Sequence, residues 1–579
     1  MNSKFFSKFK NIFSRIRILS FCILFFALIL ITKLFLVQVV HSSSYKEKAD
    51  RQYATPSSDI FERNGIFFES KNGQLVSAAV QTAGYKIAIN PTQIIDIDGA
   101  FNKLKEIIVD LDYDKFKIKA EKKADPYEEI AVHLSKGVAD SVSSLKIPGV
   151  TIYKEKWRFY PGENLAAHTL GFVGYKGDEL AGRYGLERQY NSVLSQNQNN
   201  PYINFFAEVF SNINEKLGSG DDSNGDIVTT IEPTVQGFLE KTLNDVKEKY
   251  SVDSIGGIIM NPTDGSIYAM SIKPDFNLND FSGVEDAHTF SNPIVEDVLE
   301  FGSVVKPLVM AGALNEGVVT ADTKYNDTGS VVVDKKVISN FDKKGRGPGT
   351  TMQDVLNQSL NTGMVYVYQH LGKDKLREYL LSYGIKEKTG IDLPNETSGL
   401  VSNIMTSPRD IEYANAAFGQ GIALTPIEMT RALASLSNGG NLVVPHVVKY
   451  IKYDDGTKKE MSYSLTPTKI TKKTSEEITR MMVTVMDKSF DKLSPGIERY
   501  SIAAKTGTAQ VAKENGGGYY LDRHTHSFVG FFPAYDPKFI VFLYAINPKA
   551  VQYASITWAE PFLNITKFLL NYYEIPPDR

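Results

Sequence analysis

The sequence predicts an α+β fold in which helices flank one antiparallel sheet. Two apolar runs separated by a turn occupy 256–272, and three further strand-like runs lie between 499 and 546. The stretch between these two groups has mainly helical character. Strands from both groups are therefore expected to pair in one sheet, with the helices packed against it.

Length and composition exclude several classes of protein. The 579 residues leave room for two or three domains. Hydrophobic residues make up 42% and charged residues 23%, which is typical of globular proteins and excludes a disordered or polytopic membrane chain. The 64 basic and 67 acidic residues give a net charge of −3, so nucleic acid is not an expected partner. The single cysteine, Cys22, rules out an intramolecular disulfide and a cysteine-based zinc site.

The first element is an apolar segment, Ile18–Val40, whose single charge is Lys33. Its length suits a helix that crosses a bilayer. The tail before it, 1–17, is basic and has no acidic residue, which predicts a cytoplasmic N-terminus and an extracytoplasmic body. A cleaved signal peptide is the alternative, but its apolar region is usually about 7–15 residues and ends at a small-residue cleavage site, which VVHSSS does not offer. We therefore expect a single-pass signal anchor.

The body is expected to have two parts. The hydrophilic segment Glu215–Gly225 predicts a linker, which separates an N-terminal domain at 41–220 from a C-terminal domain at 226–579. The second domain opens with a helix at Thr234–Tyr250 and the hairpin at 256–272, whose turn is Pro-Thr-Asp-Gly. Three closing strands follow, around Lys505, Phe528 and Val541, and then a helix at 559–575.

The first chemical motif is Ser303-Val-Val-Lys306, at the head of an apolar run with helical character. If Ser303 caps this helix, Lys306 shares its face. A serine hydroxyl becomes a good nucleophile when a neighbouring base removes its proton, and a lysine can be that base if its surroundings make it neutral. The S-x-x-K spacing alone has little specificity, because it also occurs at Ser7, Ser43, Ser143 and Ser489.

The second motif is Ser359-Leu360-Asn361, in which two polar residues flank an apolar one. By itself it is only a polar helix end or loop.

The third motif, Lys505-Thr506-Gly507-Thr508, lies inside an apolar strand. Strand alternation predicts Lys505 and Gly507 on one face and the two threonines on the other. Glycine in a strand also allows another backbone or a ligand to approach closely.

These three motifs in this order on an exported chain form the signature of serine penicillin-recognising enzymes. Over nearly its whole length the chain resembles a class B penicillin-binding protein, a monofunctional peptidoglycan D,D-transpeptidase with an elongated N-terminal pedestal. Further segments fall in the order of that family, namely DIFERNG (59–65), YPGENLAAHTLGFVG (160–174), GRYGLERQYN (182–191), NPTDGSIYAM (261–270), GQGIALTP (419–426) and SFVGFFPAYDPK (527–538).

Three positions depart from the family pattern. Phe301 stands where a proline usually precedes Gly-Ser, Leu360 replaces a frequent serine, and Ser57-Ser58 stand where Arg-Gly is common. None of them removes a reacting atom. Phe301 and Leu360 nevertheless bring the shape of the cleft and its antibiotic affinity into question.

The resemblance implies roles for the catalytic residues. Ser303 attacks the carbonyl of the penultimate D-alanine of a stem peptide ending in D-Ala-D-Ala, and Lys306 takes its proton. Ser359, with Asn361 orienting substrate or lysine, passes the proton to the leaving amine. Lys505 supplies positive potential near the substrate carboxylate.

The resemblance also implies a substrate-binding strand and no cofactor. Thr506 and Thr508, on either side of Gly507, bind the carboxylate, and the N–H groups of Ser303 and Thr508 form an oxyanion hole. An amine from a neighbouring stem peptide then takes the acyl group. No metal is needed, and His524 and His526 are interpreted as ordinary polar residues and not as a zinc pair.

Other functions stay open at this point. A serine β-lactamase shares the first half of the mechanism, but the Glu-x-x-Leu-Asn pattern of class A enzymes is absent between Asn361 and Lys505. A D,D-carboxypeptidase would use water as acceptor, and a non-catalytic scaffold would only bind muropeptides. A bifunctional glycosyltransferase is disfavoured because 41–220 resembles a pedestal.

The resemblance further implies a place and partners. The chain is expected in the bacterial plasma membrane, with its catalytic domain outside and β-lactams as covalent inhibitors. Its length and short pedestal favour a septal role over an elongation role. The expected partners are divisome membrane proteins and a polytopic lipid II-polymerising glycosyltransferase of the shape, elongation, division and sporulation family.

Overall fold

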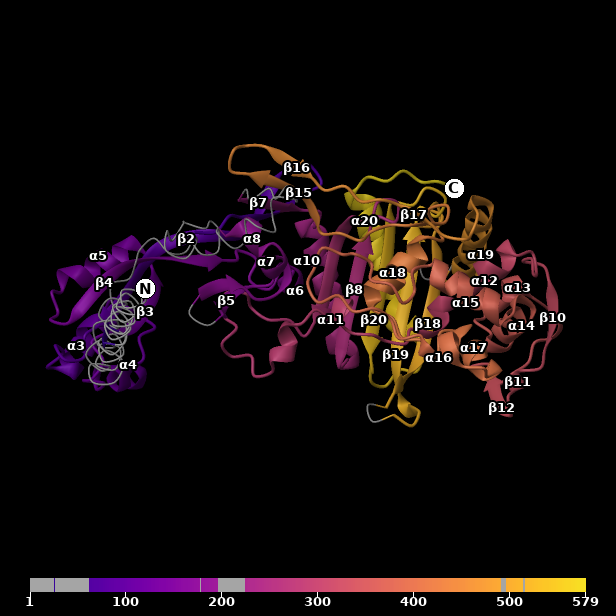
Figure 1. Ribbon diagram of the computed structural model, residues 1–579, viewed down its shortest axis with the longest axis horizontal. Helices are drawn as coiled ribbons and strands as arrows, with labels where there is room; N and C mark the ends of the chain where they lie inside the picture. Colours follow the sequence, from indigo (N-terminus) through magenta and orange to yellow (C-terminus); the bar gives the residue numbers. More distant parts are fainter. Residues whose placement is uncertain (1–24, 27–61, 177–178, 196–223, 491–495, 514–515) are drawn as a thin grey trace, which may run out of the picture. The chain divides into compact units, whose positions relative to one another are not determined.

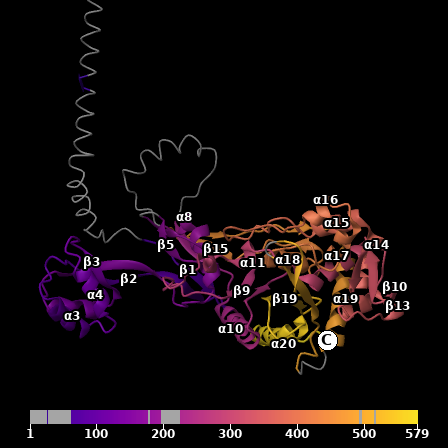
Figure 2. The same ribbon diagram turned by 90° about the horizontal axis from the view of Figure 1, so that it is seen from below.

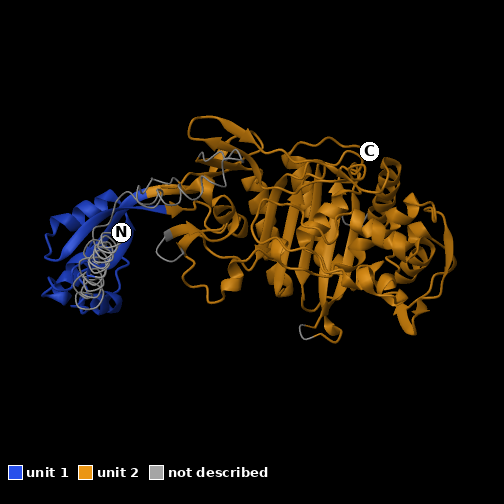
Figure 3. Cartoon of the chain, in the orientation of Figure 1, with its two compact units in different colours: residues 1–60, 83–157 blue, residues 61–82, 158–579 orange. Residues whose placement is uncertain are grey.

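The computed structural model describes residues 25–26, 62–176, 179–195, 224–490, 496–513 and 516–579. The chain forms two compact units, one containing 83–157 and the other containing 61–82 and 158–579 (Figure 3). Among the described residues no helix has both the length and the apolar character to cross a membrane. The segment predicted at 18–40 lies outside the described residues except for Phe25 and Phe26, and so does most of the predicted linker.

The first unit is a small α+β body. Its helices α3 (Ile97–Lys105), α4 (Tyr113–Ala120) and α5 (Lys136–Ser144) begin where a side chain accepts a hydrogen bond from the first turn: Asp96, Asp112 and Ser135 respectively. Its strands are β3 (Glu128–Leu134) and parts of β2 (Leu75–Ile89) and β4 (Val150–Phe159). The core includes Ile87, Leu104 and Phe116, all almost fully buried.

The second unit begins with a sheet that joins distant segments of the chain. Strand β1 (Ile66–Glu69) pairs antiparallel with β2 and parallel with β7 (Gly225–Thr229). Strand β15 (Val448–Tyr453) then pairs with β7 and with β16 (Lys458–Glu460). Short elements complete this part: α6 (Ala167–Leu170), β5 (Val173–Lys176), β6 (Glu179–Gly182), α7 (Gly185–Gln189) and α8 (Asn191–Leu194).

Buried charges hold this part together. Glu187 accepts hydrogen bonds from Arg63 Nε and Arg158 Nε, each over 2.6 Å, and its side chain is fully buried. Arg63 also reaches Asn191 and Ser195, so several segments converge on one carboxylate.

The centre of the second unit is a five-stranded sheet in the order β18-β19-β20-β8-β9 (Figure 1). Every neighbouring pair is antiparallel. The predicted pairing of the hairpin with the closing strands is therefore confirmed. The strands are β8 (Ser254–Met260), β9 (Ile267–Lys273), β18 (Ala503–Ala512), β19 (Tyr519–Phe532) and β20 (Phe539–Ile546).

Helices cover both faces of this sheet. On one face α10 (Pro233–Tyr250) and α20 (Ala554–Tyr572) lie side by side (Figure 2) and share a core with Ile259, Phe528 and Val541. On the other face Ile258 and Phe542 pack in a separate core with α12 (Lys306–Asn315) and α18 (Pro426–Ala434). The closing helix begins five residues before the predicted Ala559, since the turn after β20 is shorter than expected.

The remaining described elements complete the second unit. They comprise two 3-10 turns, η2 (Ala287–Phe290) and η3 (Gly302–Val305), and the helices α11 (Pro293–Glu296), α13 (Met352–Asn357), α14 (Asn361–Leu371), α15 (Lys373–Ser382), α16 (Ser402–Thr406), α17 (Asp410–Ala416) and α19 (Lys472–Phe490). Short strands form hairpins or pairs at β10 (Lys324–Asp327), β11 (Ser330–Val333), β12 (Lys336–Ser339), β13 (Gly347–Thr351), β14 (Asn441–Leu442) and β17 (Thr466–Pro467).

Candidate active site

Ser303 lies in the 3-10 turn η3, and α12 begins at Lys306. The residue that caps α12 is Val305, so the expectation that Ser303 caps this helix is wrong. A tight turn with three residues per turn still places Ser303 and Lys306 on the same side. Ser303 is partly exposed, and its hydroxyl forms no hydrogen bond to any other described residue.

The amine of Lys306 is fully buried at the head of α12. Its Nζ donates to the carbonyl oxygen of Ser359 over 2.6 Å and to Asn361 Oδ1 over 2.8 Å, and lies 3.3 Å from Ser359 Oγ. The first and second motifs, separated widely in sequence, therefore meet at this amine.

Lys505 approaches the same hydroxyl from the sheet. Its side chain is 2% exposed, and Nζ donates to Ser359 Oγ over 3.0 Å and to the carbonyl oxygen of Thr506 over 2.9 Å. The third motif thus joins the other two, and Ser359 lies between the two lysines.

The electrostatics of this cluster favour a neutral amine. In the described part of the chain neither lysine forms an ion pair with a carboxylate. Burial, and then the charge of Lys505, lower the pKa of Lys306 well below its usual range. Burial lowers the pKa of Lys505 to about 7. An amine with such a pKa is able to accept a proton near neutral pH.

The second motif is placed by an unusual backbone conformation. Ser359 connects α13 to α14 with φ 54°, in the left-handed region that few non-glycine residues adopt. Asn361 begins α14, and its Nδ2 donates to the carbonyl oxygen of Ser339 over 3.0 Å. The amide is thus oriented with its oxygen toward Lys306.

Gly507 lets the sheet approach the turn that carries the nucleophile. A Cβ at this position would lie 2.3 Å from Ser527 Oγ and 2.4 Å from the carbonyl oxygen of Phe301. Ser527 Oγ itself donates to that carbonyl oxygen over 2.7 Å. No residue with a side chain fits here without moving β18 or η3.

A second close approach fixes the same turn from the other side. Gly302 has φ 64° and Gly419 has φ 83°, and Gly302 N donates to Gly419 O over 3.2 Å. A Cβ at Gly419 would lie 2.1 Å from the carbonyl oxygen of Gly302. Both positions therefore require glycine.

The alternation predicted for the third motif is confirmed. Lys505 and Gly507 are buried toward Ser359 and η3, whereas Thr506 and Thr508 are partly exposed. Thr508 Oγ1 accepts a hydrogen bond from the N–H of Ala554, the first residue of α20, over 3.2 Å. Its own hydroxyl hydrogen remains able to bind a ligand.

Comparison with known proteins identifies the family of the chain. The family model for the penicillin binding protein transpeptidase domain matches residues 255–567, and the model for the penicillin-binding protein dimerisation domain matches residues 69–229. The first of these covers more than half of the chain. The chain belongs to the class B penicillin-binding proteins.

Individual relatives of this penicillin-binding protein span most of its length. Stage V sporulation protein D of Bacillus subtilis is 30% identical over 525 residues, which are 87% of this chain and 78% of that protein. The peptidoglycan D,D-transpeptidase FtsI of Buchnera aphidicola subsp. Schizaphis graminum is 25% identical, over 98% of this chain and 97% of the relative. The crystal structure of penicillin binding protein 2X from Streptococcus thermophilus shares the fold, with a TM-score of 0.69 and 20% identity over 89% of this chain and 80% of that one.

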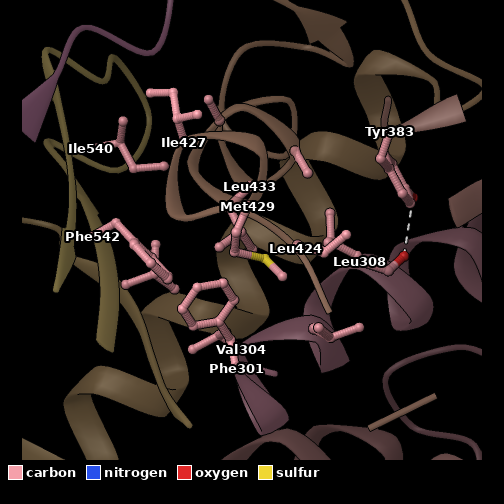
Figure 4. Packing of buried hydrophobic residues seen from close by; sticks show 14 of the residues in the cluster. Phe301, Val304, Leu308, Tyr383, Leu424, Ile427, Met429, Leu433, Ile540 and Phe542 are labelled. Carbon is pink, nitrogen blue, oxygen red and sulfur yellow. Dashed lines mark hydrogen bonds between the residues drawn. The ribbon is translucent and has the colours of Figure 1, made fainter. Parts of the chain in front are cut away.

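Two of the departures from the family pattern in this penicillin-binding protein lie in the core, whereas Ser57-Ser58 lies outside the described residues. Phe301 is 1% exposed and its ring meets those of Phe542 at 5.1 Å and Tyr544 at 6.1 Å, both on β20. Figure 4 shows this ring among Val304, Met429 and Phe542. Leu360 is fully buried. Both side chains are therefore core residues, and their effect on the shape of the cleft stays a prediction.

The histidine pair of this penicillin-binding protein, His524 and His526, lies in β19. His526 Nδ1 is hydrogen-bonded to Thr557 Oγ1 at 2.8 Å, on the face covered by α20. No cluster of three or more metal-ligating side chains occurs within the described ranges.

Sequence reasoning missed the residues that support the site without reacting. Ser527 and the carbonyl group of Ser339 hold Phe301 and Asn361 respectively. Ser527 opens a matched family segment, which is the only signal that pointed to it.

Proposed function

We propose that Ser303 of this penicillin-binding protein is the acyl-accepting nucleophile of a peptidoglycan D,D-transpeptidase. The observation that carries this proposal is the convergence of two buried lysines on Ser359, next to the turn that bears Ser303. The relative FtsI is named a peptidoglycan D,D-transpeptidase, which supports the same reaction.

The proposal gives each of these groups a step in acylation. Ser303 Oγ attacks the carbonyl carbon of the penultimate D-alanine while the neutral amine of Lys306 accepts the hydroxyl proton. The tetrahedral intermediate then collapses, its C–N bond breaks, and terminal D-alanine leaves after its nitrogen takes a proton through Ser359. Lys306 returns to its neutral form once that proton has passed on, so the number of protons balances.

The second half of the reaction uses the same groups in reverse. A neighbouring stem peptide supplies an amine that loses a proton to the Ser359–Lys306 pair and attacks the acyl carbon. The C–O bond to Ser303 breaks and the hydroxyl recovers its proton. The product is a cross-link between two stem peptides.

Binding of the substrate carboxylate is assigned to β18. Lys505 supplies positive charge, and Thr506 and Thr508 donate hydroxyl hydrogens on either side of Gly507. The N–H groups of Ser303 and Thr508 form the oxyanion hole. β-Lactams, which carry an equivalent carboxylate, bind in the same place and acylate Ser303.

The location and the partners are also part of the proposal. The segment 18–40 anchors the chain in the plasma membrane with 1–17 in the cytoplasm, 41–220 as pedestal and 226–579 as the catalytic domain outside. Partners of this arrangement are divisome membrane proteins and a polytopic lipid II-polymerising glycosyltransferase, and the role is septal. The basic tail and the apolar length of 18–40 support the orientation.

The test is covalent labelling of the detergent-solubilised full chain with a fluorescent penicillin. Wild-type protein is expected to label stably, and Ser303→Ala is expected not to label. Ser143→Ala is the matched control, because it removes the serine of another S-x-x-K sequence, on the exposed side of α5, and should label fully. Labelling of Ser303→Ala contradicts the assignment, and rapid loss of label with release of hydrolysed drug identifies a β-lactamase.

A further inference from the structure

A carboxyl group lies three residues before the nucleophile and belongs to none of the three motifs. Both oxygens of Glu300 lie 3.1 Å from the hydroxyl of Tyr519, the first residue of β19. The backbone N–H of Gly421 lies near the same carboxyl group and lowers its pKa. Glu300 therefore connects the segment before Ser303 to two other parts of the chain.

Backbone hydrogen bonds also hold the turn Phe301–Ser303, which carries the nucleophile. The backbones of Leu299 and Leu424 exchange two hydrogen bonds of 2.9 Å, and Gly302 N donates to Gly419 O. The segment 299–302 thus lies along 419–424 through its backbone. The side chain of Glu300 adds a contact with Tyr519 to the bond from Ser527 that already joins this pair of segments to β19.

The charge of Glu300 is poorly compensated. In the described part of the chain no cation forms an ion pair with it, and burial raises its pKa to about 7. The titratable group that faces it is Tyr519, whose pKa is raised by burial and by Glu300. Burying a carboxyl group without a cation lowers the stability of the folded protein. Residues that lower stability in this way are expected mainly at functional sites, and Glu300 lies beside the nucleophile.

We propose that Glu300 is a positioning residue for acylation, because its hydrogen bond with Tyr519 and its place beside the N–H of Gly421 hold the turn Phe301–Ser303 in the reactive geometry. The proposal rests on the proposed function of Ser303. Misplacement of a nucleophile by a fraction of an ångström lowers the rate of the chemical step more than it weakens substrate binding.

The substitutions at Glu300 and Tyr519 differ in which of the two contacts, with Gly421 and with Tyr519, they keep. A glutamine can accept from Gly421 N–H with its oxygen and donate to Tyr519 with its amide, so Glu300→Gln keeps both contacts. Glu300→Leu keeps the size and loses both contacts. Tyr519→Phe removes one contact and leaves the carboxyl group in place.

The experiment measures acylation of the full chain by a fluorescent penicillin in stopped flow, which separates the acylation rate constant from the dissociation constant of the non-covalent complex. Glu300→Gln is expected to keep the rate constant within about threefold. Glu300→Leu is expected to lower it by about tenfold or more with a dissociation constant changed by less than about threefold. Tyr519→Phe is expected to lie between them.

Glu296→Leu is the matched control. Glu296 is also partly buried. Its carboxyl group accepts a hydrogen bond from the backbone N–H of Asn292 over 2.9 Å, and it does not contact the turn Phe301–Ser303. Glu296→Leu should lower the melting temperature about as much as Glu300→Leu does, and it should leave the acylation rate constant unchanged. A melting curve for every variant separates loss of fold from loss of positioning.

The outcomes are distinct. A wild-type acylation rate constant in Glu300→Leu overturns the inference. An equal decrease of the acylation rate constant in Glu300→Gln and Glu300→Leu also overturns it. If Glu300→Leu does not fold, Tyr519→Phe decides: a rate constant lowered at least about threefold supports the inference and an unchanged one overturns it. Wild-type protein that does not label contradicts the proposed function instead.

Discussion

Lys306 and Lys505, on separate elements, both reach the hydroxyl oxygen of Ser359, at 3.3 Å and 3.0 Å. Because Ser359 Oγ faces two amines, its own hydrogen is left to point toward a substrate. Two buried amines this close cannot both remain charged without a large cost in free energy. The pair therefore supplies one proton acceptor and one positive charge from the same residue type.

The rate of acylation should depend on pH as a bell-shaped curve. Lys306 must be neutral to act as base, so the rate rises as pH increases through its lowered pKa. Lys505 must be charged to attract the substrate carboxylate, so the rate falls as pH rises through about 7 in the free enzyme. The measurement is the second-order acylation constant with a fluorescent penicillin from pH 5 to pH 10. Lys505→Arg keeps a charge at high pH and should lose the falling limb, whereas a wild-type rate that climbs steadily to pH 10 contradicts this account.

The stability of the protein should rise with pH because of Lys505. The folded pKa is about 7 and the unfolded value is about 10.4, so between them the unfolded chain binds a proton that the folded chain does not. The difference in melting temperature between wild type and Lys505→Met should therefore shift in favour of wild type from pH 7 to pH 9. Exposed Lys241→Met provides the comparison and should show no such shift. A difference that stays constant with pH would show that Lys505 keeps an ordinary pKa in the folded protein.

Gly507→Ala should damage the site. The new Cβ would lie 2.4 Å from the carbonyl oxygen of Phe301, which is backbone and cannot rotate away. We expect a loss of about 1–3 kcal/mol in the free energy of unfolding and an acylation rate at least about tenfold lower, as β18 moves from η3. Gly237→Ala is the control. Gly237 lies within α10, and a Cβ added there would have its nearest neighbouring atom 4.0 Å away. This substitution should therefore stabilise the protein slightly, because alanine favours a helix more than glycine does. Unchanged acylation in Gly507→Ala would argue against the close approach.

Phe301→Ala should lower the stability of the protein through the cavity that it leaves. The ring is 1% exposed and contacts Phe542 at 5.1 Å. A loss of about 3–5 kcal/mol in the free energy of unfolding is expected, and a smaller one for Phe301→Leu. Phe341→Ala, at a position 55% exposed, should cost less than about 1.5 kcal/mol. Equal losses at the two positions in denaturant titrations would disprove the core position of Phe301.

Glu187→Gln should strongly destabilise the second unit. Burial alone would raise the pKa of Glu187, but Arg158 and Arg63 lower it, so the group is charged in the folded protein. Without this charge two buried arginines lose their counterion, at a cost of about 3–5 kcal/mol. Asp245→Asn, in an exposed pair with Lys241, should cost less than about 1 kcal/mol. Similar melting temperatures for the two variants would contradict the prediction.

The limits of sequence reasoning show at particular residues. Alternation along the third motif predicted correctly that Lys505 and Gly507 share one face, because a strand has a fixed period of two, and the structure shows that this face is the buried one. The cap assigned to Ser303 was wrong, since a 3-10 turn and an α-helix begin with similar residues and differ only in their hydrogen bonds. The importance of Phe301 and Leu360 was inferred from residue type alone, and the structure adds that both side chains are buried.

By itself the sequence determined the family, the order of the three motifs and the pairing of distant strands in one sheet, because periodicity and motif order are properties of the chain. Tertiary structure alone decided that two lysines contact one serine hydroxyl. It also decided that the backbone of another segment packs closely against Gly507 and against Gly419, and that Glu300 is hydrogen-bonded to Tyr519. Such relationships depend on distances between residues far apart in sequence. Burial and the resulting pKa values depend on the same distances, and so they appear only once the chain is folded.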